Sequence, residues 1–159
     1  MKLLDLVDRR AIVAELQGPD RNAVIRELVQ VLADAGQISP DEVERTVKSI
    51  VARERTRGTT GFGKGVAVPH AKVEGQPRVV AAVGRSVSGI DFASLDGEPV
   101  FGLFLIVSPV DQAEQHLQAM DVVFRVLQQE KFRKFLRQSD TTEKIYDLLA
   151  EADEKLLVE

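Results

Sequence analysis

The sequence predicts an α/β fold in which helices flank a mixed sheet. Three observations predict it: helix-like spacing of apolar residues in the first third of the chain, β-branched runs in the middle, and helix-like spacing again after Pro109. Strands with helices before and after them form a sheet that is covered by helices. The chain has 159 residues, 44% of them hydrophobic, which is enough for one core and one domain.

Two amphipathic helices are predicted before Gly58. Asp20 caps the first, which ends before Gly36 and carries apolar residues at spacings of three and four: Val24, Leu28, Val31, Leu32 and Ala35. Ser39 opens the second, because a proline follows at the first helical position and a glutamate at the third. This helix must stop before Gly58.

Strands are predicted next. Residues 66–68 form a short strand that the following proline stops, and a loop then leads to His70. Residues 79–87 and 100–107 form longer strands, and the second is nearly all apolar, as in a central strand covered on both faces. Residues 11–14 are a candidate for a further strand.

Helices return after Pro109. The first of them carries an apolar face, made of Leu117, Met120, Val123, Phe124 and Leu127. A second apolar group follows at Phe132, Phe135 and Leu136, and residues 140–143 cap a last helix that contains Ile145, Leu148 and Leu149.

Composition excludes several classes of protein. The formal charge of −4 does not favour a general nucleic-acid-binding surface. The absence of cysteine excludes disulfides, thiolate zinc sites and cysteine nucleophiles. The longest apolar run, residues 100–107, is far shorter than a membrane span, and the acidic N-terminus does not resemble a signal peptide. We therefore expect a cytoplasmic protein without direct membrane insertion.

A basic segment nevertheless lies inside this acidic chain. Residues 53–78 carry a net charge of +4, so the rest of the chain carries −8. The cations stand around the glycine-rich segment 58–65, where backbone N–H groups could approach an anion closely. Phosphate is the leading candidate for that anion.

The glycine-rich segment is not a good P-loop. It fits the G-x-x-x-x-G-K pattern, but Gly65 stands where a hydroxyl must reach magnesium. A P-loop also follows a strand and opens a helix, whereas this segment follows a predicted helix and leads into a strand. The plain alternative to a phosphate site is a structural loop of turn glycines.

His70 is the strongest candidate for chemistry. It directly follows the glycine-rich segment, a short strand and Pro69. Cationic neighbours would lower its pKa and keep the imidazole neutral, the form that attacks phosphorus to give phosphohistidine. An alternative is a small hydrolase with His70 as general base, but no serine or carboxylate stands beside it in the sequence.

His116, the only other histidine, has two interpretations. It is either a histidine at the edge of the core or a second imidazole that faces His70. A metal site is not favoured, because the two histidines lack any ligand spacing.

Residues 60–72, TGFGKGVAVPHAK, resemble the active-site signature of the fructose/mannitol-type enzyme IIA domains of the bacterial phosphoenolpyruvate-dependent sugar phosphotransferase system, which include the nitrogen-regulatory IIA proteins. The resemblance covers essentially the whole chain and extends to the segments 41–53, 91–100 and 109–117.

The resemblance implies roles for individual residues. His70 corresponds to the phosphorylated histidine, and His116 to the second active-site histidine. The arginine before the glycine-rich segment corresponds to Arg53 or Arg55, because this segment is one residue longer than in the family. The remaining residues expected to stabilise the phosphoryl group are Thr60, Gly61, Gly63, Lys64 and Lys72; Lys64 stands where nitrogen-regulatory members often have asparagine.

The resemblance also implies a mannitol enzyme IIA-like α/β sandwich with a mixed, mostly parallel sheet, formed by residues 1–159 as one IIA domain without a fused IIB or IIC. The donor would be HPr or a related phosphocarrier, and the acceptor a IIB component or a regulatory protein, with no metal or other cofactor. The sugar, the choice between transport and regulation, and the oligomeric state, including a homo-oligomer, stay open. The alternative is a module of the same fold that binds proteins without being phosphorylated.

Overall fold

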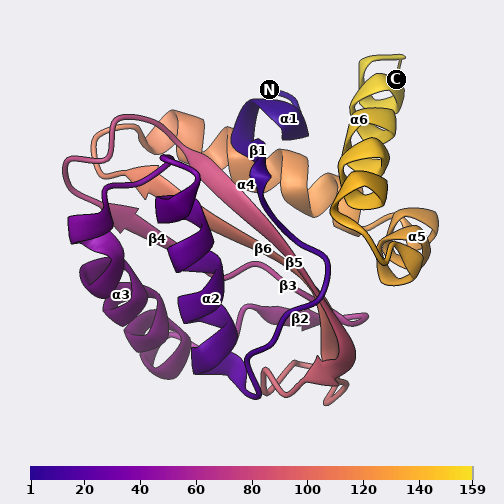
Figure 1. Ribbon diagram of the computed structural model, residues 1–159, viewed down its shortest axis with the longest axis horizontal. Coiled ribbons are helices and arrows are strands. Elements are labelled where there is room, and N and C mark those ends of the chain that lie inside the picture. The colour runs from indigo at the N-terminus through magenta and orange to yellow at the C-terminus, as the bar shows by residue number, and fades with distance from the viewer. Residues whose placement is uncertain (159) are drawn as a thin grey trace.

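The computed structural model describes the backbone of residues 1–158 and the side chains of residues 1–155 (Figure 1). The described elements, in chain order, are α1 (Leu3–Leu6), β1 (Val7–Val13), α2 (Arg21–Asp34), the 3₁₀ helix η1 (Pro40–Glu42), α3 (Val43–Thr56), β2 (Gly61–Gly63), β3 (Val66–Ala67), β4 (His70–Val73), β5 (Val80–Ile90), β6 (Val100–Pro109), α4 (Ala113–Leu127), α5 (Glu130–Gln138) and α6 (Thr142–Val158).

The strands form one mixed sheet with the order β1-β5-β6-β3-β2, and β4 also pairs with β6. Three pairs are parallel, namely β1 with β5, β3 with β6 and β4 with β6. The pairs β5–β6 and β2–β3 are antiparallel. The predicted mixed, mostly parallel sheet is therefore confirmed.

Helices cover both faces of this sheet, as Figure 1 shows. One core packs α2 and α3 against one face, and a second core packs α1, α4, α5 and α6 against the other. Strand β6 contributes to both cores, and all of its residues except Phe101 are buried. This confirms the expectation of a central strand that is covered on both faces.

The helix caps follow the sequence closely. The Asp20 carboxylate accepts a hydrogen bond from the Ala23 N–H, and Thr141 Oγ1 accepts one from the Lys144 N–H. Ser39 caps η1 rather than an α-helix, because one 3₁₀ turn precedes α3.

The strands around Pro69 differ from the expectation. We expected a loop before His70, but His70 is the first residue of β4. Because β5 occupies one edge of β6, β3 and β4 lie one after the other along its other edge, where Val66 pairs with Gly102 and His70 with Ile106. Pro69 lies between the two strands and its carbonyl accepts a hydrogen bond from the Ile106 N–H.

Helix α1 was not predicted from the sequence. Its first turn is hydrogen-bonded to a residue near the other end of the chain. The carboxylate of Asp153 on α6 accepts hydrogen bonds from the N–H groups of Leu3 and Leu4, at 2.6 and 3.0 Å. Asp153 is only 5% exposed. These two N–H groups begin α1 and have no acceptor within it, so the long-range carboxylate replaces a local cap.

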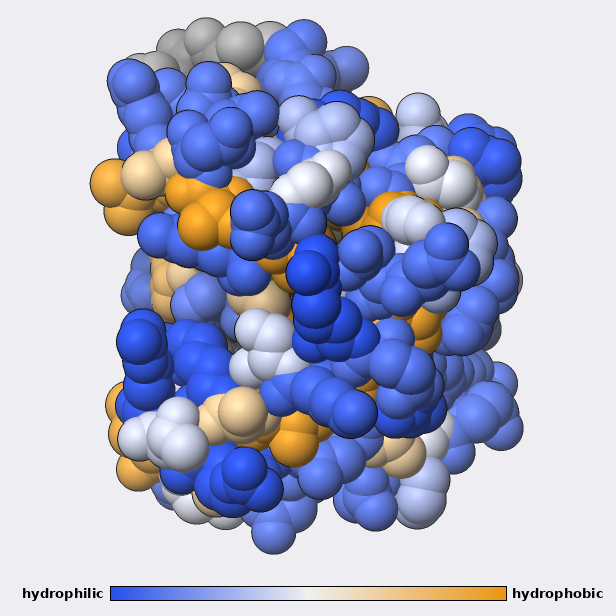
Figure 2. All heavy atoms as spheres, turned by 90° about the vertical axis from the view of Figure 1, so that its left-hand side faces the viewer, coloured by the Kyte–Doolittle hydropathy of each residue, from blue (hydrophilic) through white to orange (hydrophobic). Residues whose placement is uncertain are grey.

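Two apolar residues assigned to buried helix faces are exposed instead. Leu117 on α4 is 67% exposed and Phe135 on α5 is 43% exposed. The buried face of α4 is instead formed by His116, Ala119, Val123, Val126 and Leu127. On the side of the molecule where α3 lies, Figure 2 shows a mainly hydrophilic surface with small, separated apolar patches.

Candidate functional site

The backbone holds the ring of His70 in one tautomer. Its Nδ1 lies 2.8 Å from the carbonyl oxygen of Val68. A carbonyl only accepts hydrogen bonds, so in the neutral imidazole Nδ1 carries the proton and Nε2 has the lone pair. Burial is the main cause that lowers the pKa of His70, and the positive charges of Arg53 and Lys72 lower it further. The hydrogen bond to Val68 and the charge of Glu54 act in the opposite direction and raise it, but the net shift is downward. The structure therefore favours a neutral imidazole with a nucleophilic Nε2.

His116 lies beside His70. Their ring centroids are 5.7 Å apart, although one residue belongs to β4 and the other to α4. The Nδ1 of His116 is 2.6 Å from Oγ of Ser108, which is fully buried at the end of β6. Burial lowers the pKa of His116, and the charges of His70 and Lys72 act in the same direction.

Two cations share this site. Lys72 and His70 are alternate residues of β4, so both project from the same face of the strand, while Ala71 and Val73 pack into the core on the other face. Arg53, in the last turn of α3, is half-buried, and its Nη1 is a buried donor without a hydrogen-bond partner among the described residues. A buried, unsatisfied guanidinium N–H next to an imidazole is an available donor for an anion.

The glycine-rich segment does not present a free cradle of N–H groups. The N–H and Oγ1 of Thr60 donate to the buried carboxylate of Glu54, and the Gly61 N–H donates to Thr59 Oγ1. The Lys64 N–H donates to the carboxylate of Asp96. Gly63 lies in β2 and pairs with β3. The N–H groups of Thr60, Gly61 and Lys64 are thus already bonded, to α3, to the segment itself and to the connection between β5 and β6.

The basic segment is also more dispersed than its sequence suggests. Arg55 is exposed on α3 and borders a groove with α2, away from the imidazoles. Lys64 lies at the turn between β2 and β3. The carbonyl of its neighbour Gly65 accepts hydrogen bonds from the N–H groups of Phe101 and Gly102 at the start of β6. His70 pairs with Ile106, four residues further along β6 than Gly102, or about 13 Å at 3.3 Å per residue. Of the predicted cations, Arg53 and Lys72 are the two that reach His70.

Three residues of the site were not identified from the sequence. Val68 supplies a carbonyl, Ser108 a hydroxyl and Glu54 a buried carboxylate that is 3% exposed. One feature of the sequence could have pointed to Ser108, because it is the first polar residue after a long apolar run. Glu54 stands next to Arg53 in a helix, where an exposed charge would be the ordinary assumption.

The described residues include no group of three or more histidine and carboxylate side chains arranged to hold a metal ion. Among the helices of residues 1–158, none is both long and apolar enough to cross a membrane.

Residues 5–152 match the family model described as "Phosphoenolpyruvate-dependent sugar phosphotransferase system, EIIA 2". The chain belongs to this family. It is 33% identical over 150 residues to a nitrogen regulatory protein of Bradyrhizobium diazoefficiens, which covers 94% of this chain and 95% of that protein. It is 30% identical over 153 residues to the fructose-specific EIIABC component of Bacillus subtilis, which covers 96% of this chain but only 24% of that longer protein.

Solved structures of EIIA proteins have the same fold. The nitrogen regulatory protein IIA-Ntr of Neisseria meningitidis superposes with a TM-score of 0.80 at 24% identity, over 91% of this chain and 97% of that one. The mannitol enzyme IIA of Escherichia coli, in its complex with phosphorylated mannitol enzyme IIB, superposes with a TM-score of 0.75 at 17% identity, over 92% and 99% of the two chains. The mannitol enzyme IIA-like sandwich expected from the sequence is confirmed.

Proposed function

We propose that this EIIA chain is a phosphoryl carrier that accepts a phosphoryl group on Nε2 of His70. The donor is the phosphohistidine of HPr or of a related phosphocarrier, and the acceptor is a IIB component or a regulatory protein. One observation carries the proposal: the hydrogen bond from Nδ1 to the Val68 carbonyl leaves Nε2 as the unprotonated nitrogen. Membership of the EIIA 2 family supports the same class of chemistry.

The transfer needs no additional base. The lone pair on Nε2 of His70 attacks phosphorus, the nitrogen–phosphorus bond of the donor breaks, and its electron pair stays on the donor's imidazole. No proton is gained or lost overall, because each ring keeps the N–H of its other nitrogen both with and without the phosphoryl group. The lowered pKa of His70 favours this reaction, since the protonated ring has no lone pair to offer.

Neighbouring groups are placed to stabilise the charge. Phosphoryl transfer depends mainly on positioning and on donors aimed at the phosphoryl oxygens. The unpartnered Nη1 of Arg53 and the ammonium of Lys72 supply positive charge near His70. When the hydroxyl of Ser108 donates to Nδ1 of His116, the Nε2 of His116 carries a proton and serves as a further donor.

Two exposed apolar side chains close in sequence to the site support docking of a protein partner. Leu117, which directly follows His116, is 67% exposed, and Val110, which follows the end of β6, is 52% exposed. Exposed apolar residues beside a reactive imidazole are suited to exclude water when a second protein approaches it. In the related E. coli structure, mannitol enzyme IIA is bound to phosphorylated enzyme IIB.

The experiment is phosphorylation of the purified chain by radiolabelled phosphoenolpyruvate, enzyme I and HPr. We expect acid-labile, alkali-stable label on the native chain and none on His70→Gln, with matching circular dichroism spectra as the check on folding. Label that persists in His70→Gln overturns the assignment of the residue. An unlabelled native chain that still binds HPr or a IIB protein favours the alternative of a binding module.

A further inference from the structure

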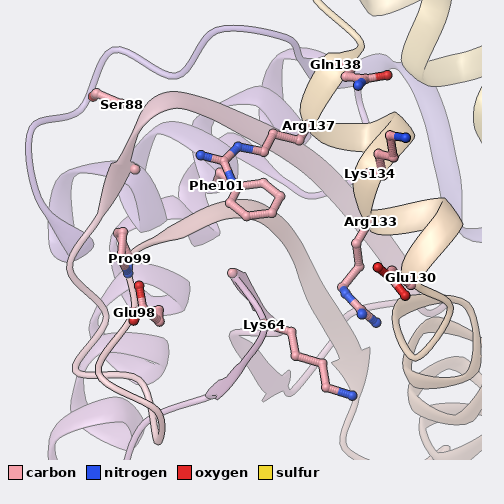
Figure 3. Close-up of a pocket in the computed structure, with 12 residues that line it drawn as sticks. Lys64, Ser88, Glu98, Pro99, Phe101, Glu130, Arg133, Lys134, Arg137 and Gln138 are labelled. Atoms are coloured by element: carbon pink, nitrogen blue, oxygen red, sulfur yellow. The ribbon is translucent and has the colours of Figure 1, made fainter.

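A second group of cations surrounds a cavity at the opposite end of β6 from His70. The cavity has a volume of about 540 Å³ and lies between the β2–β3 turn, the start of β6 and helix α5. Its walls include Lys64, Phe101, Glu130, Arg133, Lys134 and Arg137 (Figure 3). A concave site of this volume is in the range that binds small molecules.

The positive charges of these walls are only partly compensated. Among the described residues, no carboxylate oxygen lies within 4 Å of the charged nitrogens of the four cations. Glu98 and Glu130 also border the cavity, so its walls carry a net charge of +2. Figure 3 shows Arg133 descending from α5 toward the part of the cavity that Lys64 borders. Three cations of α5 and one at the β2–β3 turn thus border the same hollow, and this arrangement attracts a multiply charged anion.

The walls are held in place before any ligand arrives. The guanidinium of Arg137 lies over the Phe101 ring, 4.4 Å from its centroid, and Nη1 of Arg133 donates to the Leu127 carbonyl. Phe101 in turn packs against Gly65, where an added Cβ would lie 2.0 Å from the ring. Such fixed walls reduce the ordering cost of binding.

Lys64 adds an independent sign of a functional position. Its φ is 62°, in the left-handed region, where a residue with a side chain is disfavoured by about 1 kcal/mol relative to the right-handed region. Asp96 holds this backbone through the Lys64 N–H at 2.9 Å, while the ammonium is left without an ion pair among the described residues. The carboxylate therefore fixes where the lysine stands without neutralising it.

We propose that this cavity binds a small organic phosphate with at least two negative charges. Guanidinium groups bind phosphate oxygens in pairs, and lysines add point charge. The concave shape, with Pro99 and Phe101 among its lining residues, favours a small molecule with an organic part over a flat protein surface or inorganic phosphate alone. The site is separate from the phosphoryl-transfer site and does not depend on the function proposed for His70.

The test is isothermal titration calorimetry of the whole chain with three probes: ADP, glucose 6-phosphate and inorganic phosphate. We expect ADP or glucose 6-phosphate to bind with a Kd of about 1 mM or tighter, and inorganic phosphate to bind more weakly. The two organic probes distinguish a nucleotide from a sugar phosphate as the source of the anion. Failure of both organic probes to bind overturns the proposal.

Variants locate the binding. Arg133→Gln combined with Arg137→Gln is expected to weaken it at least 10-fold, whereas Lys48→Gln, which removes a cation from the groove between α2 and α3, leaves it unchanged. Because both arginines make structural contacts, Lys64→Gln combined with Lys134→Gln is the second pair, and it is expected to have the same effect. Unchanged affinity in the folded lysine pair, or equal loss in Lys48→Gln, overturns the proposal.

Discussion

The ring of His70 faces the ring of His116 across 5.7 Å, with their planes inclined by 51°. Each ring uses its Nδ1 to contact a different kind of oxygen, a backbone carbonyl for His70 and a hydroxyl for His116. The carbonyl allows one tautomer, whereas the hydroxyl both donates and accepts. The pair therefore combines an imidazole suited to attack with one suited to donate a hydrogen bond.

The contact between Ser108 and His116 is open to a direct test. Ser108→Ala removes the partner of Nδ1 and leaves His116 free to change tautomer. We expect a several-fold slower transfer to the acceptor protein, because a lost neutral hydrogen bond is worth about 1 kcal/mol. Single-turnover rates and the NMR titration of His116 measure the effect. Ser108→Thr keeps the hydroxyl and is expected to recover part of the rate; an Ala variant with the native rate contradicts the positioning role.

The two arginines in the last turn of α3 are expected to differ. Arg53→Gln removes the unpartnered donor near His70 and slows phosphorylation of the chain by about 100-fold, the usual effect of losing one charge-stabilising donor. Arg55→Gln changes an exposed side chain of the same helix and leaves the rate near that of the native chain. Rapid-quench labelling from phosphorylated HPr measures both rates. A slow Arg55→Gln variant together with a near-native Arg53→Gln variant would contradict this prediction and would assign the contact with the phosphoryl group to Arg55.

The buried carboxylate of Glu54 should stabilise the start of the hairpin. Glu54→Ala leaves the N–H and hydroxyl of Thr60 without their acceptor in a buried place and is expected to lower the free energy of unfolding by about 2–4 kcal/mol. Glu44→Ala is the matched control on the same helix, because Glu44 forms an exposed ion pair with Arg26, and such pairs contribute about 0–1 kcal/mol. Urea unfolding compares the two variants, and equal losses would contradict the prediction.

The lowered pKa values of His70 and His116 predict how the free energy of unfolding depends on pH. Their pKa values in the folded chain lie below the ordinary value of 6.5, chiefly because burial disfavours the charged ring. Between the folded and unfolded pKa values the unfolded chain binds more protons, so the free energy of unfolding rises with pH in that window and falls as pH drops below 6.5. Chemical unfolding at about pH 7.5 and about pH 5 measures the difference. His70→Asn combined with His116→Asn should make that difference smaller; an unchanged difference would assign the pH dependence to other groups.

Local sequence patterns predicted most of the fold but less of the site. Periodicity and caps located α2, α3 and the last helix, because these signals act within one or two turns. The site depends on pairing between distant segments. No local signal indicates that His70 would pair with Ile106, that Ser108 would reach His116, or that the Lys64 N–H would already be bound to Asp96. The net charge of residues 53–78 also does not tell which of its cations lie near His70, because neighbours in sequence diverge in space when one lies on a helix and the next in a hairpin.

The break between β3 and β4 has a chemical consequence of its own. Proline has no N–H, so Pro69 cannot donate a hydrogen bond to a neighbouring strand, although its carbonyl accepts one from the Ile106 N–H of β6. The carbonyl just before it, that of Val68, accepts a hydrogen bond from the Nδ1–H of His70. The two-residue gap between these strands, Val68 and Pro69, thereby sets the protonation pattern of an imidazole. Engineering a reactive histidine into a new sheet could follow the same plan, with an X-Pro-His step next to a buried strand in place of a dedicated carboxylate.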